Sequence, residues 1–430
     1  MKSRVLFVTA MNLFAALLLQ VRLAAQEQQK SYITHQSQYR IKDLGTLPGN
    51  SYSVGYGIND KGQVTGLSCD ADFSKCRAFL WRHGVMIDLG TLGGPNSEAG
   101  WHPSDRGQVG VAGETSTRDP LGEDFCGFGT NLVCLPFVWQ KGEKTVLPTL
   151  GGNNGRANGF NNWGQVVGRV ENTTPDPTCE APQVLQSLPV IWKDGQIEEQ
   201  LPTIPGDSRG GAVAINDRGQ AVGFSGNCTT PLHAVLWEDG TAMDLGNLGS
   251  EIGNVATAIN NRGQVVGYSD LPDDTATHAF LWQNGVMGDL GALPGDSFSF
   301  GDGINRQGHV VGASCDIDFN CRAFLWRHGV MIDLNTLISP NSPLFLIEAS
   351  GTINSRGQIA GYALEISTDE IHAFLATPRE KEAGTESAAL AAQGTIREAS
   401  KVIVPESVRK LLRARLARRV PLHPGLWPQM

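Results

Sequence analysis

The sequence predicts an all-β fold, a seven-bladed β-propeller closed by a strand from the N-terminus. A turn of the form N-D-x-G-Q, followed by an apolar strand, occurs in seven versions along the chain. The turn glycines lie 44 to 57 residues apart, and they are Gly62, Gly107, Gly164, Gly219, Gly263, Gly308 and Gly357. A repeat of about this length with several short strands is typical of propeller blades.

Residues 256–290 show one complete repeat, in which four strands A to D are expected. Residues 256–259 form strand A, and the turn at Asn260 and Gly263 leads into strand B at 264–269. A polar loop precedes strand C at 279–283, and the Asn284-Gly285 turn precedes strand D at 286–290. Asn and Gly suit such hairpin turns because both tolerate positive φ.

The two ends of the repeat array complement each other. Residues 39–47 resemble a strand D without a repeat of its own, whereas repeat seven stops after strand C at 373–375. Pairing of these segments would complete the last blade and remove an exposed sheet edge. An open β-solenoid is the alternative fold, but it would not need residues 39–47 to supply the strand that repeat seven lacks.

Charge limits the classes of partner. Formal net charge is −9, from 34 Lys and Arg against 43 Asp and Glu. The first 25 residues contain three of the positive charges and residues 378–430 contain ten positive and five negative charges, which leaves −17 for residues 26–377. Such a body repels nucleic acid and anionic lipid, so neither is expected to bind it.

The N-terminus has the pattern of a secretory signal peptide, assigned here to residues 1–25. Lys2 and Arg4 precede an apolar run that ends at Leu19, and Ala24-Ala25 offers a cleavage site. The alternative is an uncleaved anchor, but the run is short of the roughly 20 residues that span a bilayer. We therefore expect an extracellular or periplasmic protein without stable membrane insertion.

Eight cysteines in an exported chain indicate disulfides. Three pairs flank single loops and the fourth follows by elimination; the pairs are Cys69–Cys76, Cys126–Cys134, Cys315–Cys321 and Cys179–Cys228. Free or metal-bound thiols are the alternative, but the spacings do not match the usual zinc patterns.

The C-terminal segment 378–430 breaks the repeat pattern and is expected to be a flexible linker with a basic amphipathic tail. Residues 406–420 combine apolar positions at helical spacing with six Lys and Arg. A membrane-surface helix, docking on the acidic body and disorder all fit this pattern. Because the propeller closes before it, removal of the tail is expected to leave the melting temperature nearly unchanged.

The repeat resembles that of the bacterial extracellular HAF-repeat family. The motif H-A-F occurs at His278-Ala279-Phe280 and His372-Ala373-Phe374, between N-D-x-G-Q-V-V-G and D-L-G-T-L-G-G motifs. Several copies depart from it, with Arg77 and Arg322 in place of His. The resemblance covers residues 39–377 and implies export and a repeat fold, but no assigned activity and no catalytic residue.

Strand alternation places the B–C and D–A loops on one face, here called the loop face, and the A–B and C–D turns on the other, the turn face. The loop face holds the insertions 115–135, 172–188 and 270–277 and all eight cysteines. Variable loops on a rigid scaffold are where binding usually occurs. The loop face and the mouth of the central channel are therefore the candidate site.

Other candidate residues have simpler interpretations. Asp70 with Asp72, and Asp316 with Asp318, could hold Ca²⁺ but lack the further ligands of a calcium loop. Histidines that begin C strands are expected to be structural, and these are His233, His278 and His372. Six C-strand tryptophans are expected in the core. No nucleotide, zinc-protease or serine-hydrolase motif is found.

The function that these features favour is non-catalytic binding of a protein or glycan by a secreted, monomeric propeller. No catalytic residue, cofactor or metal is assigned. The alternative is a polysaccharide lyase or glycosidase with acids at the channel mouth, and a cell-surface structural role is a third possibility. Fold alone does not decide among them.

The disulfide framework is the first testable prediction. Peptide mapping without reduction should recover Cys69–Cys76, Cys126–Cys134, Cys315–Cys321 and Cys179–Cys228 as linked peptides. Eight free thiols in the exported protein would contradict the framework.

Overall fold

A computed structural model describes residues 39–228, 232–272, 275–379, 402–406 and 409. The chain divides into two units. One comprises Arg40–Thr377 with Ala399–Met430 and contains the propeller. The other comprises Met1–Tyr39 with Pro378–Glu398 and lies almost entirely outside the described residues, as does the expected signal peptide.

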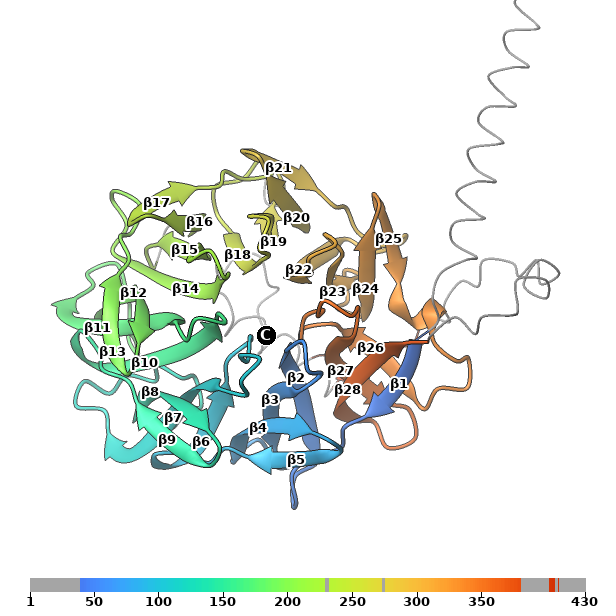
Figure 1. Ribbon diagram of the computed structural model, residues 1–430, viewed down its shortest axis with the longest axis horizontal. Coiled ribbons are helices and arrows are strands. Elements are labelled where there is room, and N and C mark those ends of the chain that lie inside the picture. The colour runs from blue at the N-terminus through green and yellow to red at the C-terminus, as the bar shows by residue number, and fades with distance from the viewer. Residues whose placement is uncertain (1–38, 229–231, 273–274, 380–401, 407–408, 410–430) are drawn as a thin grey trace, which may run out of the picture. The chain divides into compact units, whose positions relative to one another are not determined.

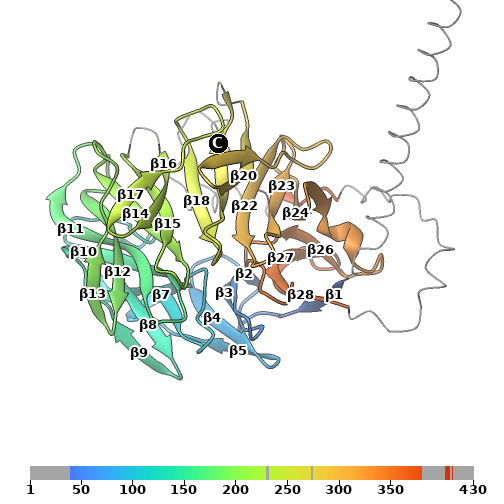
Figure 2. The ribbon, with the colours of Figure 1, turned by 45° about the horizontal axis from the view of Figure 1, so that its top comes forward.

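Seven four-stranded antiparallel sheets form the propeller, which confirms the predicted fold class. In each sheet the strands follow the order A-B-C-D, and in Figure 1 the A strands β2, β14, β18 and β22 lie near the centre of the ring. The D strands lie at the rim, and Figure 2 shows the blades standing side by side around the ring.

The strands of blades one to four follow the chain in groups of four. Blade one contains β2 (Tyr52–Ile58), β3 (Val64–Cys69), β4 (Cys76–Arg82) and β5 (Val85–Asp88). Blade two contains β6 (Gly93–Ala99), β7 (Val109–Arg118), β8 (Leu132–Gln140) and β9 (Glu143–Val146). Blade three contains β10 (Gly151–Phe160), β11 (Val166–Pro175), β12 (Leu185–Lys193) and β13 (Gln196–Gln200). Blade four contains β14 (Arg209–Ile215), β15 (Ala221–Gly226), β16 (Leu232–Glu238) and β17 (Thr241–Asp244).

The last three blades complete the ring. Blade five contains β18 (Asn254–Ile259), β19 (Val265–Asp270), β20 (Thr277–Gln283) and β21 (Val286–Asp289). Blade six contains β22 (Phe298–Ile304), β23 (Val310–Cys315), β24 (Cys321–Arg327) and β25 (Val330–Asp333), followed by the 3-10 helix η2 (Leu334–Leu337). Blade seven contains β26 (Leu344–Glu348), β27 (Ile359–Glu365), β28 (Glu370–Pro378) and β1 (Tyr39–Asp43). Within the described ranges, no helix is long and apolar enough to cross a membrane.

The C-strand aromatic residues form the cores between blades. Trp192 and Phe280 are fully buried, and Trp237 is almost fully buried. The second glycine of G-Q-V-V-G lets strands A and B of one blade approach closely, because a Cβ on Gly267 would lie 1.9 Å from the Val255 carbonyl oxygen. The repeated motif is thus a packing requirement of neighbouring strands.

The Asn and Gln of the repeat form one hydrogen-bonded unit at each A–B turn. In blade four, Asn216 Oδ1 accepts the N–H groups of Arg218 and Gln220, at 2.9 and 3.0 Å. Its Nδ2 donates to Gln220 Oε1 at 2.8 Å and to the Asn260 carbonyl of blade five at 3.0 Å. One side chain therefore closes its own turn and joins two blades.

The same inter-blade bond recurs around the turn face, and we call this set the asparagine ring. It joins Asn59 to Ser104, Asn161 to Asn216, Asn216 to Asn260, Asn260 to Asn305, Asn305 to Asn354, and Asn354 to Asn59. The last bond connects residues 295 positions apart at 3.0 Å and joins blade seven to blade one.

Blade two departs from the asparagine ring because Ser104 occupies the Asn position. Ser104 makes two of the turn contacts of Asn with its hydroxyl group, which accepts the Gln108 N–H at 3.1 Å and donates to Gln108 Oε1 at 3.2 Å. Its side chain is too short to reach blade three. There the His102 carbonyl accepts the Phe160 N–H at 3.1 Å instead, so a backbone bond replaces the missing amide contact.

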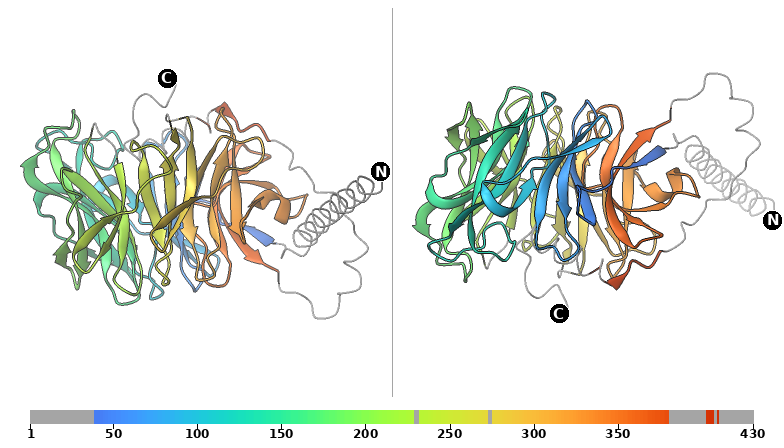
Figure 3. Two further views of the ribbon diagram at one scale, coloured as in Figure 1. Left: turned by 90° about the horizontal axis from the view of Figure 1, so that it is seen from above. Right: turned by 90° about the horizontal axis from the view of Figure 1, so that it is seen from below.

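β1 makes with β28 the contacts that β21 makes with β20. His372 Nδ1 lies 2.8 Å from Asp43 Oδ2, and Leu44 N donates to the Ala373 carbonyl at 2.9 Å. In blade five, His278 and Asp289 are 2.9 Å apart and Leu290 donates to Ala279 at 2.9 Å. Figure 3 shows β1, in blue, beside the orange and red strands of blade seven.

Deleting residues 38–47 tests whether β1 holds the ring closed. Without it, β28 becomes an unpaired sheet edge, and such edges pair with other chains. We expect aggregation and a broad, less cooperative melt, measured by light scattering and calorimetry. Deletion of residues 381–390 is the matched control and should leave both unchanged. Two monomeric deletion variants with the same cooperative melt would show that closure does not need β1.

Candidate functional site

Four disulfides fasten the loop face, and their pairs are the four expected from the sequence. Cys69–Cys76 and Cys315–Cys321 each join the end of a B strand to the start of its C strand. Cys179–Cys228 joins blade three to blade four. Disulfides therefore fix the B–C loops of blades one, two, three, four and six.

Two of the predicted insertions are partly strand. β7 and β8 continue pairing as far as Arg118 and Leu132, and β11 and β12 continue as far as Pro175 and Leu185. The backbone groups of these segments find partners across the hairpin, so the loops themselves are shorter than the sequence suggested. Blades two and three thus extend the loop face as tall hairpins.

An apolar cluster surrounds the centre of the propeller and reaches the loop face. We call its part at the loop face, around Tyr52 and Phe298, the mouth. It combines side chains from blades one, four, five, six and seven with Trp101 of blade two. Its aromatic members are Tyr52, Tyr56, Trp101, Phe224, Tyr268, Phe298, Phe300, Phe345 and Tyr362. The cluster therefore includes aromatic side chains from six of the seven blades.

Matched aromatic stacks stand at the mouth in blades one and six. Phe73 stacks on Tyr52 with ring centroids 4.7 Å apart, and Phe319 stacks on Phe298 at 5.4 Å. Phe73 and Phe319 have positive φ values of 58° and 62° within the two equivalent cysteine loops. Since this backbone region is unfavourable for bulky residues, the disulfide-closed loops hold these rings in place.

A short C-terminal segment lies against the same cluster. Val404 is fully buried in it and Val402 packs against it, whereas the sequence left docking on the body open beside a membrane-surface helix and disorder. Val404 N donates to Asn320 Oδ1 of blade six at 3.2 Å. The expectation that tail removal leaves stability unchanged therefore needs revision, because removal would uncover part of the mouth. No spacing pattern in the sequence pointed to these two valines.

The first aspartate of each D-x-D pair accepts hydrogen bonds from residues of its own loop. Asp70 Oδ1 accepts the Lys75 N–H at 3.0 Å, and Asp70 Oδ2 accepts the Ser74 hydroxyl at 2.7 Å. Asp316 Oδ1 accepts the N–H groups of Asp318 and Asn320, both at 3.0 Å. These contacts give both aspartates a structural role in shaping the loops beside the mouth.

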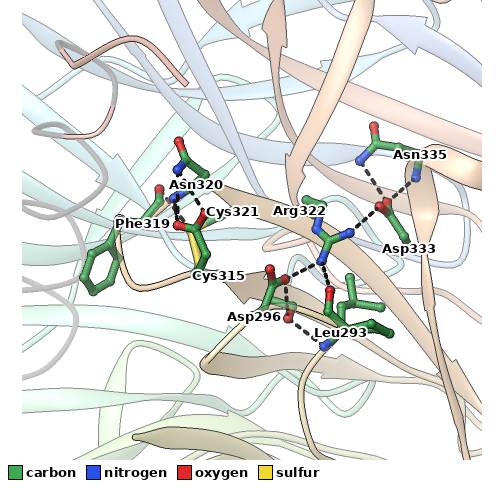
Figure 4. Close-up of polar contacts among 12 residues, drawn as sticks. Leu293, Asp296, Cys315, Phe319, Asn320, Cys321, Arg322, Asp333 and Asn335 are labelled. Carbon is green, nitrogen blue, oxygen red and sulfur yellow. Dashed lines mark hydrogen bonds and ion pairs between the residues drawn. A yellow bond between two sulfur atoms is a disulfide. The ribbon is translucent and has the colours of Figure 1, made fainter. Parts of the chain in front are cut away.

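The C-strand histidines pair across to the D strands, as their structural interpretation required. His233 lies 2.9 Å from Asp244, and His372 lies 2.8 Å from Asp43, a bond that raises the pKa of His372. Arg322 replaces His in blade six and contacts both Asp333 and Asp296, at 3.2 and 2.8 Å (Figure 4).

Two buried glutamates join the tall hairpins of blades two and three, and sequence reasoning missed them. Glu123 Oε1 accepts the N–H groups of Val184 and Leu185, at 2.6 and 2.8 Å. Gln183 Nε2 donates to both Glu123 and Glu171, each at 3.1 Å. Burial, and next the Glu123 carboxyl group, raise the pKa of Glu171 to about 7.

Three arginines gather in blades three and four. Arg156 and Arg169 face each other across β10 and β11, and Arg169 lies 4.8 Å from the Phe125 ring. Burial and the charges of Arg209 and Arg156 lower the pKa of Arg169. Among the described residues, the Arg169 guanidinium has no hydrogen bond or ion pair. Carboxyl groups lie beside this cluster, since Arg156 contacts Glu98 at 3.0 Å.

Glu171 gives a prediction for the pH dependence of stability. Folded Glu171 holds its proton up to about pH 7, whereas an unfolded glutamate releases it near 4.5. The free energy of unfolding therefore falls as pH rises between these values. One pKa unit corresponds to about 1.4 kcal/mol, so Glu171→Gln should be more stable than the wild type by at least that amount at pH 8.

Denaturant titrations at pH 5 and pH 8 measure this difference. Glu143→Gln is the control, because Glu143 is exposed on β9. The control should keep the wild-type change in the free energy of unfolding between pH 5 and pH 8. In Glu171→Gln this change should be smaller. If the free energy of unfolding changed with pH in Glu171→Gln as it does in the wild type, Glu171 would have the same pKa in the folded and the unfolded protein.

Comparisons with known proteins add a likeness of fold. No family model matches the chain, and no curated protein matches it. The β-propeller domain of the Trilobed protease from Pyrococcus furiosus shares 11% identity, with a TM-score of 0.46, over 75% of this chain and 95% of that one. An acylaminoacyl peptidase from Pyrococcus horikoshii shares 10% identity, with a TM-score of 0.47, over 77% of this chain and 52% of that one. This chain thus spans about half of that peptidase, and such likenesses carry no argument about ligand or reaction.

Proposed function

We propose that the protein is an exported, non-catalytic propeller that binds a protein or glycan at the mouth of its loop face. The observation that carries the proposal is the aromatic mouth framed by disulfide-closed loops. Pockets for ligands are mostly apolar and are held by rigid surroundings. Here the rigid surroundings are the blades, and Cys69–Cys76 and Cys315–Cys321 fix the loops beside the stacked rings.

The proposal includes an organisation of the chain and a compartment. Residues 1–25 are the signal peptide, 26–377 the propeller, and 378–430 the linker and basic tail. Membership of the HAF-repeat family is part of the same proposal. It is supported by the H-A-F and D-L-G motifs, whose His and Asp pair across strands C and D. The four disulfides support an oxidising compartment outside the cytoplasm.

The contacts of Glu123 and Glu171 support binding over catalysis. A glycosidase or lyase of this fold would need carboxyl groups from several blades converging on the mouth. Glu123 and Glu171 do come together, but they accept hydrogen bonds from the backbone and amide groups of the blade-two and blade-three hairpins. Their geometry serves the attachment of two loops.

A binding screen tests the function. Residues 26–430 should be applied to glycan and protein arrays, and hits should then be measured with Phe73→Asp. Phe73 is 37% exposed at the mouth, so its replacement by a charge should weaken binding about tenfold, or 1.4 kcal/mol.

Trp163→Ala is the matched control, because Trp163 is a 67% exposed aromatic residue at a turn on the opposite face. It should leave binding unchanged. Hits that respond to Trp163→Ala and not to Phe73→Asp would place the site on the turn face and contradict the proposal.

A further inference from the structure

We propose that residues 402–405 of the tail are a tethered ligand of the mouth, and that the mouth binds extended apolar peptides. The inference rests on the proposed function, because it names the ligand class of the same site. It also assigns the tail a regulatory role, since a segment that occupies the mouth competes with any outside ligand.

The burial of the segment has the period of an extended peptide. Val402 is half-buried and packs against the central cluster, Ile403 is 74% exposed, and Val404 is fully buried. Alternate side chains of an extended chain point to opposite sides. One side of the segment therefore enters the mouth with two valines while the other side faces solvent.

The backbone of the segment is also recognised. Val404 N–H donates to Asn320 Oδ1, and the Asn320 side chain is itself fixed by Asp316 at 3.1 to 3.2 Å. Asn320 precedes the disulfide-bonded Cys321, and Figure 4 shows it beside Phe319. A contact with the main chain does not depend on the ligand's side chains, so other extended peptides can use it.

The length of the linker and the charge of the tail both favour occupancy of the mouth by residues 402–405. Residues 379–401 join β28 to it, and these 23 residues reach at most about 80 Å when extended. A tether of this kind gives an effective concentration on the order of millimolar. Residues 378–430 have a surplus of five positive charges and the body carries −17, so long-range attraction acts in the same direction.

The two valines define the ligand class. A peptide that fits as the tail does has β-branched aliphatic residues two positions apart, and the second of them offers its N–H group to Asn320. Aromatic walls accept such side chains without requiring a particular charge. The surrounding acidic body favours peptides with flanking Lys or Arg, as the tail itself has at Lys401 and Arg409.

Fluorescence anisotropy with a labelled peptide of residues 399–409 tests the proposal. The proteins compared are the full chain, a chain ending at Arg379, Val404→Asp and Ile403→Asp. We expect the shortened chain and Val404→Asp to bind the peptide at least about tenfold more tightly than the full chain, because the tethered competitor is gone or displaced. Ile403→Asp, whose side chain is exposed, should bind as weakly as the full chain.

A second peptide carrying Asp at position 404 serves as the ligand control and should not bind the shortened chain. A shortened chain that fails to bind the natural peptide, or Val404→Asp and Ile403→Asp proteins that behave alike, would overturn the inference. Both substitutions lie outside the blades, so circular dichroism should show the same fold in each.

The outcome is separable from that of the proposed function. An array ligand that depends on Phe73 but binds the full and shortened chains equally would support the function and overturn the tethered ligand. Peptide binding by the shortened chain without any array hit would support the tethered ligand alone.

Discussion

Six of the seven blades of this propeller depend on one asparagine side chain at the A–B turn, and blade two has Ser104 there instead. Asn216 uses both lone pairs of Oδ1 within its turn and both hydrogens of Nδ2, one for Gln220 and one for the next blade. A serine or aspartate at this position could satisfy the turn but could not donate to two acceptors. The recurrence of Asn with Gln four positions later therefore follows from hydrogen-bond capacity, and the exception at Ser104 interrupts the asparagine ring between blades two and three.

Because the blades are joined to one another at the turn face, the loops of the opposite face can vary. Because blades are joined through the asparagine ring and through Trp-lined cores, the B–C loops do not have to hold the ring together. They can differ in length, as the tall hairpins of blades two and three do. Disulfides fix these hairpins, with Cys126–Cys134 inside blade two and Cys179–Cys228 between blades three and four. Blades two and three also share the Glu123 and Glu171 contacts on the loop face, which join the neighbours that the asparagine ring leaves unjoined.

The fold was predictable because its signals are local and repeated. Asn–Gly turns, C-strand tryptophans and the cysteine loops at 69–76 and 315–321 recur at equivalent positions of the repeat, so the copies reinforce one interpretation. The site was predictable only to the level of a face. Glu123 meets Val184 across 61 residues, and Val404 meets Asn320 across 84, and neither pair belongs to a repeated pattern. Contacts that occur once and join distant segments leave no periodic trace in a single sequence.

The burial of Val404 has two physical interpretations, a permanent plug and a displaceable ligand. Burying a valine contributes about 1.5–3 kcal/mol, and fixing the backbone of one residue costs about 1–2 kcal/mol. With two valines facing the cluster and four residues held, gain and cost are comparable. The bond to Asn320 adds about 1 kcal/mol. A permanent plug would need a larger surplus, such as a strand pairing or a disulfide to the body. A net binding free energy near zero allows a tighter ligand to displace the segment from the mouth. The energetics of the tail therefore favour a displaceable ligand at a binding site over a permanent plug.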